Sequence, residues 1–126
     1  MFAKEGAAVV LVARREEKLI EVEKRITKEG GRALTIPGDV TSLADCKNVF
    51  EQTIETFGKV DILVNNAGIA DLHMPTIRVT DKLWHDVIII NLTGTFLFCR
   101  EALGYITQAN SGVIVNVSSI GGVYGW

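Results

Sequence analysis

The sequence predicts an α/β fold in which a doubly wound parallel sheet lies between two layers of helices. Continuous apolar runs rich in β-branched residues alternate along the chain with segments of helical periodicity, which is typical of parallel strands joined by crossover helices. The chain has 126 residues, of which 48% are hydrophobic and 22% charged, and a net charge of −2. This composition predicts one soluble globular domain over residues 1–126.

The first half of this pattern is a strand followed directly by a helix. Buried-type strands are expected over residues 7–13, 33–37, 61–65 and 112–117. After the first strand, Leu19, Val22 and Ile26 recur at the spacing of one helix face, and two glycines, Gly30 and Gly31, follow. They predict a helix that ends at this glycine pair.

Two further helices are expected after the second and third strands. Ser42 with Asp45 three residues later resembles a capping box, and it predicts a helix with a buried stripe of Cys46, Val49, Phe50, Ile54 and Phe57. Residues 66–79 are expected to form a loop, and Thr80 then caps a long helix that reaches about residue 108. The expected inward face of this helix consists of Leu83, Trp84, Val87, Ile88 and Leu92.

Several functional classes are disfavoured by the composition. The isoelectric point of about 5.7 gives no basic surface for nucleic acid. Cys46 and Cys99 lie far apart, and His73 and His85 have no partners at metal-ligand spacing, so we expect reduced thiols, no metal site and a cytoplasmic protein. The apolar run at 7–13 is far shorter than the roughly 20 residues of a membrane span, so no membrane partner is expected.

Candidate binding residues follow the strands, because ligands of open α/β sheets bind beyond the carboxyl ends of the strands. These strand ends are residues 13–15, 39–40, 65–68 and 118–119, and each is polar or contains glycine. At residues 65–68 (NNAG), small residues allow the backbone to approach a flat ligand, and the amides can tie neighbouring strands together. An ordinary turn is the alternative interpretation, since Asn and Gly are common turn residues.

Four motifs in a fixed order carry a family resemblance. They are GDV at residues 38–40, NNAG at 65–68 after DILV, NLTG at 91–94 and NVSS at 116–119. This set resembles the short-chain dehydrogenase/reductase family over essentially the whole chain. The resemblance implies a Rossmann-like dinucleotide-binding domain that is incomplete here, because the family's first strand with its glycine-rich loop and its catalytic Tyr and Lys are expected outside this sequence. In the doubly wound order the absent strand lies between the first and third strands of this chain.

The resemblance also implies site residues. Asp39 and Val40 match the position that contacts the adenine ring, and the family segment that lines the cofactor matches Asn65, Ala67 and Gly68. Ser119 matches the catalytic serine, whose hydroxyl would stabilise the charge that develops on a substrate oxygen, with Ser118 as the competing choice. Asn91 matches the helix asparagine that holds a water in the proton relay; a hydrogen-bonded core asparagine is the alternative.

The residues after the first strand bear on the choice of cofactor. Arg14 matches the arginine of NADP-preferring relatives, where arginine accommodates the 2′-phosphate, and Ala13 occupies the place of the acid that binds the ribose of NAD. We therefore expect NADP(H), with NAD(H) possible. Alternatively, Arg14 and Arg15 simply begin a solvated helix.

The implied activity is hydride transfer between the cofactor and a small carbonyl or alcohol substrate, by a homo-oligomer (dimer or tetramer). A non-catalytic nucleotide-binding module on the same fold is the alternative function. Residues 71–75 and 123–126 are candidates to border the substrate, whereas Tyr124 lies too close to Ser119 to match the catalytic tyrosine. The 126-residue polypeptide by itself is expected to fold poorly and to be inactive, because two strand edges would be unpaired.

Overall fold

The computed structural model describes residues 1–70 and 74–120 of the chain. The chain divides into two compact units, Met1–Val60 and Asp61–Trp126. Both have the strand, helix, strand order that the alternating apolar and amphipathic segments predict.

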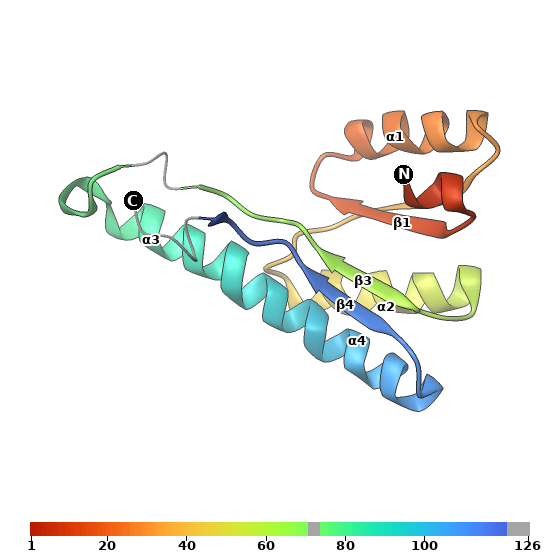
Figure 1. Ribbon diagram of the computed structural model, residues 1–126. Helices are drawn as coiled ribbons and strands as arrows, with labels where there is room; N and C mark the ends of the chain where they lie inside the picture. The colour runs from red at the N-terminus through yellow and green to blue at the C-terminus, as the bar shows by residue number, and fades with distance from the viewer. Residues whose placement is uncertain (71–73, 121–126) are drawn as a thin grey trace. The chain divides into compact units, whose positions relative to one another are not determined.

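The first unit is built on two parallel strands. A short 3₁₀ helix, Phe2–Glu5, precedes β1 (Ala8–Ala13), and α1 (Glu16–Lys28) leads to β2 (Arg32–Pro37). The strands pair in parallel from Ala8 with Arg32 to Ala13 with Pro37. Helix α2 (Leu43–Phe57) completes the unit, and Figure 1 shows α1 lying along this strand pair.

Both faces of this strand pair are covered. The Thr35 hydroxyl donates to the Glu23 carboxylate of α1 at 3.3 Å. The next residue, Ile36, points to the opposite face and is only 1% exposed. Helix α2 contacts β1 and contributes most of the buried side chains of the unit, namely Cys46, Val49, Phe50 and Thr53. The predicted stripe of this helix is thus confirmed for Cys46, Val49 and Phe50.

The second unit contains β3 (Ile62–Asn65) and β4 (Val113–Asn116), which pair in parallel. Between them lie a 3₁₀ turn (Thr76–Arg78), α3 (Asp81–Val87), a π-helical segment (Ile88–Gly94) and α4 (Thr95–Ala109). Helix α4 packs on both strands, as Figure 1 shows. Its buried residues are Leu97, Phe98 and Ala102.

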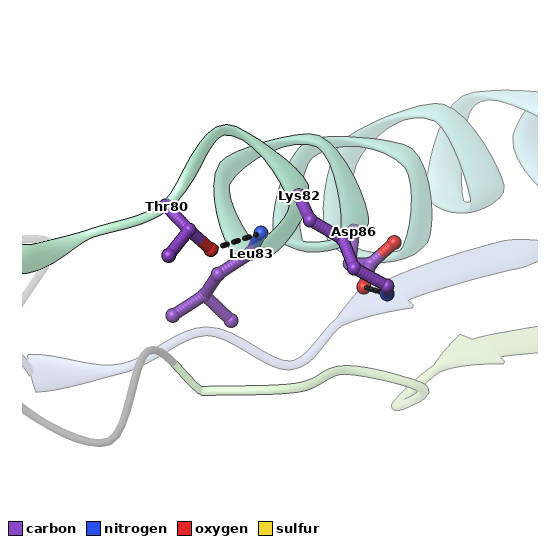
Figure 2. Close-up of polar contacts among 4 residues, drawn as sticks. All are labelled: Thr80, Lys82, Leu83 and Asp86. Atoms are coloured by element: carbon purple, nitrogen blue, oxygen red, sulfur yellow. Dashed lines mark hydrogen bonds and ion pairs between the residues drawn. The ribbon is translucent and has the colours of Figure 1, made fainter.

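The predicted start of the long helix is confirmed. The Thr80 hydroxyl accepts a hydrogen bond from the Leu83 amide at 3.1 Å, which satisfies one of the free N–H groups of the first turn. Lys82 and Asp86, four residues apart, form an ion pair on the same helix. Figure 2 shows both interactions.

The predicted inward face of this helix is wrong at two positions. Trp84 and Leu92 are 64% and 63% exposed. The π-helical segment holds more residues per turn than an α-helix, so an α-helical pattern extended through it does not keep its register. In addition, α3 runs directly into the π segment, and its main contacts are with this continuation of the same helix, so Trp84 has little to pack on. Apolar spacing predicts which residues share a face, but not whether that face has a partner.

The pairing of the strands agrees with the doubly wound order. The described residues form two two-stranded sheets, β1 with β2 and β3 with β4. The order 3-2-1-4-5-6 contains two such neighbouring pairs, strand 2 with strand 3 and strand 4 with strand 5.

One helical stretch, Asp81–Ala109, is long and apolar enough to cross a membrane by length and composition. The core helix of a soluble protein passes the same test. Asn91, Thr93 and Thr95 place polar side chains along it. The expectation that the chain has no membrane partner stays a prediction.

Candidate functional site

Asp39 is held from several directions just beyond the end of β2. Its Oδ1 accepts hydrogen bonds from the backbone N–H and the hydroxyl of Thr41, at 2.9 and 2.8 Å. Its backbone carbonyl accepts from the Ser42 amide at 3.0 Å. The two bonds from Thr41 lower the pKa of the Asp39 carboxyl, and the positive charge of Arg14 lowers it further, against the opposing effect of burial. The half-buried Asp39 therefore stays ionised at neutral pH.

Arg14 lies at the corresponding end of β1. The Gly38 amide donates to the Ala13 carbonyl at 3.0 Å, so the pairing of the two strands extends to their carboxyl ends. A surface pocket opens there, lined by Ala13, Arg14 and Arg15, and both arginines are exposed. The first unit thus brings together a cation and a carboxylate predicted for the adenosine end of a cofactor.

In the second unit, Asn65 ties the two strands together. Its Nδ2 donates to Oδ1 of Asn116 at 2.8 Å and to the Cys99 sulfur of α4 at 3.2 Å. The Val117 amide donates to the Asn65 carbonyl at 2.9 Å, so the strand pairing continues past β4. The prediction that amides in the NNAG segment connect neighbouring strands is confirmed at Asn65.

Asn91 binds the loop that follows this segment. Its Oδ1 accepts from the Ile69 amide at 2.9 Å, and its Nδ2 donates to the Ile69 carbonyl at 2.8 Å. The side chain is hydrogen-bonded, as the alternative interpretation required, but Asn91 is exposed rather than part of a core. A β-carbon built on Gly68 would lie 3.4 Å from Asn91 Oδ1. The π-helical segment therefore holds the backbone directly after the NNAG motif. The implied role of Asn91 in a proton relay stays a prediction.

Ser118 and Ser119 follow β4, which is the neighbour of β3. The exposed Ala67 and Gly68 follow β3, and both serines are exposed. Since the strands are parallel, these residues lie beyond the same edge of the sheet, where bound ligands are expected. The assignment of Ser119 rather than Ser118 remains a prediction.

Some predicted residues lie outside the described residues. These are Asp71 and His73, together with Tyr124 and the candidate substrate border at 123–126.

Two contacting residues were not identified from the sequence. Cys99 touches Asn65 across 34 positions of the chain, and no local pattern indicates such a contact. Asp45 was predicted only as a capping residue, and it does donate its N–H to the Ser42 hydroxyl, at 3.2 Å. However, its carboxylate accepts from the Asp39 amide at 2.8 Å, whereas a capping box would bring it back to the amide of Ser42. The acidic residue at this position was the available signal.

Comparisons with known proteins all match this chain to dehydrogenases and reductases. The family model described as short chain dehydrogenase matches residues 1–126. A 3beta-hydroxysteroid dehydrogenase of Mediterraneibacter gnavus is 39% identical over 124 residues, which are 98% of this chain and 45% of that protein.

Two solved structures are also similar. A 3-ketoacyl-ACP reductase from Sinorhizobium meliloti has a TM-score of 0.88 at 34% identity, over 96% of this chain and 48% of its own. A variant of actinorhodin polyketide ketoreductase with NADPH has a TM-score of 0.94 at 36% identity, over 99% of this chain and 48% of its own. The chain thus spans about half the length of the proteins it matches.

Proposed function

Because the chain belongs to the short-chain dehydrogenase family, we propose that the protein containing it transfers a hydride between NADP(H) and a small carbonyl or alcohol substrate. One observation carries the cofactor half of this proposal: Arg14 and the ionised Asp39 lie at the carboxyl ends of the paired strands β1 and β2. A cation suited to a 2′-phosphate and an acceptor suited to an adenine amino group meet there.

The residues of the first unit fit the adenosine part of the cofactor. Oδ1 of Asp39 is occupied by Thr41, while Oδ2 has no hydrogen-bond partner among residues 1–70 and 74–120. Oδ2 is thus an available acceptor for an exocyclic amino group. The exposed guanidinium of Arg14 can donate to a phosphate in a bidentate manner. Val40 would contact the adenine ring.

The residues of the second unit would hold the reacting end. When bound, NADP(H) would supply or accept the hydride. The backbone at Ala67 and Gly68 would border it, because neither residue carries a bulky side chain. The Ser119 hydroxyl would donate to the substrate oxygen and stabilise the negative charge that develops there during reduction.

The names of the relatives support a ketone or an alcohol as the class of substrate. The relatives are a hydroxysteroid dehydrogenase, a ketoacyl reductase and a polyketide ketoreductase. A ketone or the corresponding alcohol is common to the three names. We therefore propose a ketone–alcohol pair as the substrate of this protein too.

The direct test is turnover in the protein that contains this chain. NADPH oxidation is followed by the absorbance of the reduced nicotinamide with a panel of ketones, for the wild type, Ser119→Ala and Ser118→Ala. We expect reduction by the wild type, a loss of about 10²-fold or more in kcat for Ser119→Ala, and little change for Ser118→Ala. Tight binding of NADPH without turnover on any ketone or alcohol would favour the alternative, a non-catalytic nucleotide-binding module.

We also propose a cytoplasmic homo-oligomer, a dimer or tetramer. Its support is a set of exposed apolar side chains on the long helix, namely Leu92, Phe96 and Leu103, each about half exposed or more. Apolar side chains grouped in this way are typical of interaction surfaces. Sedimentation of Phe96→Glu against the wild type tests this: a smaller species is expected, and an unchanged mass would contradict it.

A further inference from the structure

The carboxylate of Asp45 holds the backbone of Asp39. Its Oδ2 accepts from the Asp39 N–H at 2.8 Å, while its own N–H donates to the Ser42 hydroxyl at 3.2 Å. The Ser42 N–H in turn donates to the Asp39 carbonyl at 3.0 Å. The three bonds form a closed ring that joins the end of β2 to the first turn of α2.

This ring holds Asp39 through its backbone and leaves its side chain to other partners. The N–H of Asp39 is bound to Asp45 and its carbonyl to Ser42, while Oδ1 is bound to Thr41. The two backbone bonds restrain the peptide groups on either side of Asp39, and with them the start of Val40, while Thr41 orients the carboxylate.

Asp45 also lies close to the neighbouring Gly38. A β-carbon on Gly38 would lie 3.4 Å from the β-carbon of Asp45 and 3.8 Å from its Oδ2. The side chain of Asp45 therefore packs directly against the backbone at the end of β2.

We propose that Asp45 is a positioning residue for the adenosine end of the cofactor, acting through the backbone of Asp39. The inference rests on the proposed function, because it assigns Asp45 to the binding of NADP(H). The effect comes from the position of the acceptor oxygen rather than from the negative charge of Asp45.

Two substitutions separate position from charge. Asp45→Asn keeps an acceptor oxygen at the same distance along the side chain but removes the charge. Asp45→Glu keeps the charge, and with it the favourable interaction of an acid with the first turn of a helix, but moves the acceptor by one methylene group. The matched control is Glu51→Ala, which removes an exposed carboxylate from the same helix.

The experiment uses the protein that contains this chain and two readouts. Titration calorimetry measures binding of 2′,5′-ADP, which carries only the adenosine half of NADP, and kinetics measures kcat at saturating NADPH. We expect Asp45→Glu to weaken 2′,5′-ADP binding about threefold to tenfold, the value of one net hydrogen bond, with kcat unchanged. Asp45→Asn and Glu51→Ala should bind within about twofold of the wild type.

The outcomes distinguish this inference from the proposed function. Binding of 2′,5′-ADP by the wild type with no loss in Asp45→Glu would overturn the role of Asp45 alone. A loss in Asp45→Asn equal to that in Asp45→Glu would also overturn it, because charge would then be the cause. A wild type that binds neither 2′,5′-ADP nor NADPH would refute the proposed function and this inference with it.

Discussion

The side chain of Asn91 binds both polar backbone groups of Ile69, accepting from its N–H at 2.9 Å and donating to its carbonyl at 2.8 Å. Asn91 belongs to the π-helical segment, and Ile69 directly follows the NNAG motif that begins at the end of β3. One amide thus joins the long helix to the loop in which a cofactor is proposed to bind. π-Helical turns occur frequently at functional sites.

Loss of this amide should loosen the loop at Ile69. We expect Asn91→Ala to lower the free energy of unfolding by about 1 kcal/mol, since typical net hydrogen-bond contributions are of that size. Hydrogen exchange of the Ile69 amide should become faster. Asn48→Ala, which removes an exposed helical asparagine bonded to the Gln52 side chain, is the control and should leave that amide unchanged. Unchanged exchange at Ile69 in Asn91→Ala would show that the contact does not restrain the loop.

The bond between Asn65 and Asn116 should contribute to the pairing of β3 and β4. A double-mutant cycle with Asn65→Ala and Asn116→Ala measures the coupling, for which we expect about 1 kcal/mol by urea unfolding. Strictly additive effects would mean that the 2.8 Å contact contributes nothing to stability. The Cys99 contact with Asn65 remains in the Asn116→Ala variant and limits its loss.

Gly68→Ala separates the two interpretations of the NNAG segment. Gly68 is not among the residues with positive φ, and an added β-carbon would make only an ordinary contact, at 3.4 Å, with Asn91. The unfolding free energy should therefore change by less than about 0.5 kcal/mol, while NADPH affinity should fall severalfold. Gly58→Ala is the opposite control: with φ of 78° it should lose about 1 kcal/mol of stability and keep its cofactor affinity. Unchanged affinity in Gly68→Ala would favour an ordinary turn.

The lowered pKa of Asp39 predicts a pH dependence of stability. The two hydrogen bonds from Thr41, with Arg14 adding to them, favour the ionised carboxyl in the folded state. A pKa that folding lowers stabilises the protein above the pKa of the unfolded chain, and this stabilisation is lost as the pH falls through the folded-state value. The stability difference between the wild type and Asp39→Asn should thus be constant near neutral pH and shrink below about pH 4. A stability difference between the two proteins that grows as the pH falls would contradict this prediction.

The sequence predicted where helices and strands begin and end better than it predicted which side chains would contact one another. The caps at Ser42 and Thr80 were predictable because the hydroxyl of each residue accepts from a backbone N–H only three residues later. The exposure of Trp84 and the contact of Cys99 with Asn65 were not, since they depend on which segments meet in three dimensions. Asp45 illustrates both cases. Its place in the first turn of α2 could be predicted from the sequence, but its bond to Asp39 depends on the path of the chain between β2 and α2.

Arg14 should decide whether the protein prefers NADPH to NADH. Dissociation constants of NADPH and NADH are measured for the protein that contains this chain and for its Arg14→Ala variant, with Arg25→Ala, an exposed arginine at the far end of α1, as control. We expect the wild type and Arg25→Ala to bind NADPH about tenfold or more tightly than NADH, and Arg14→Ala to lose this preference while its NADH affinity is unchanged. Equal or tighter binding of NADH by the wild type would contradict this expectation.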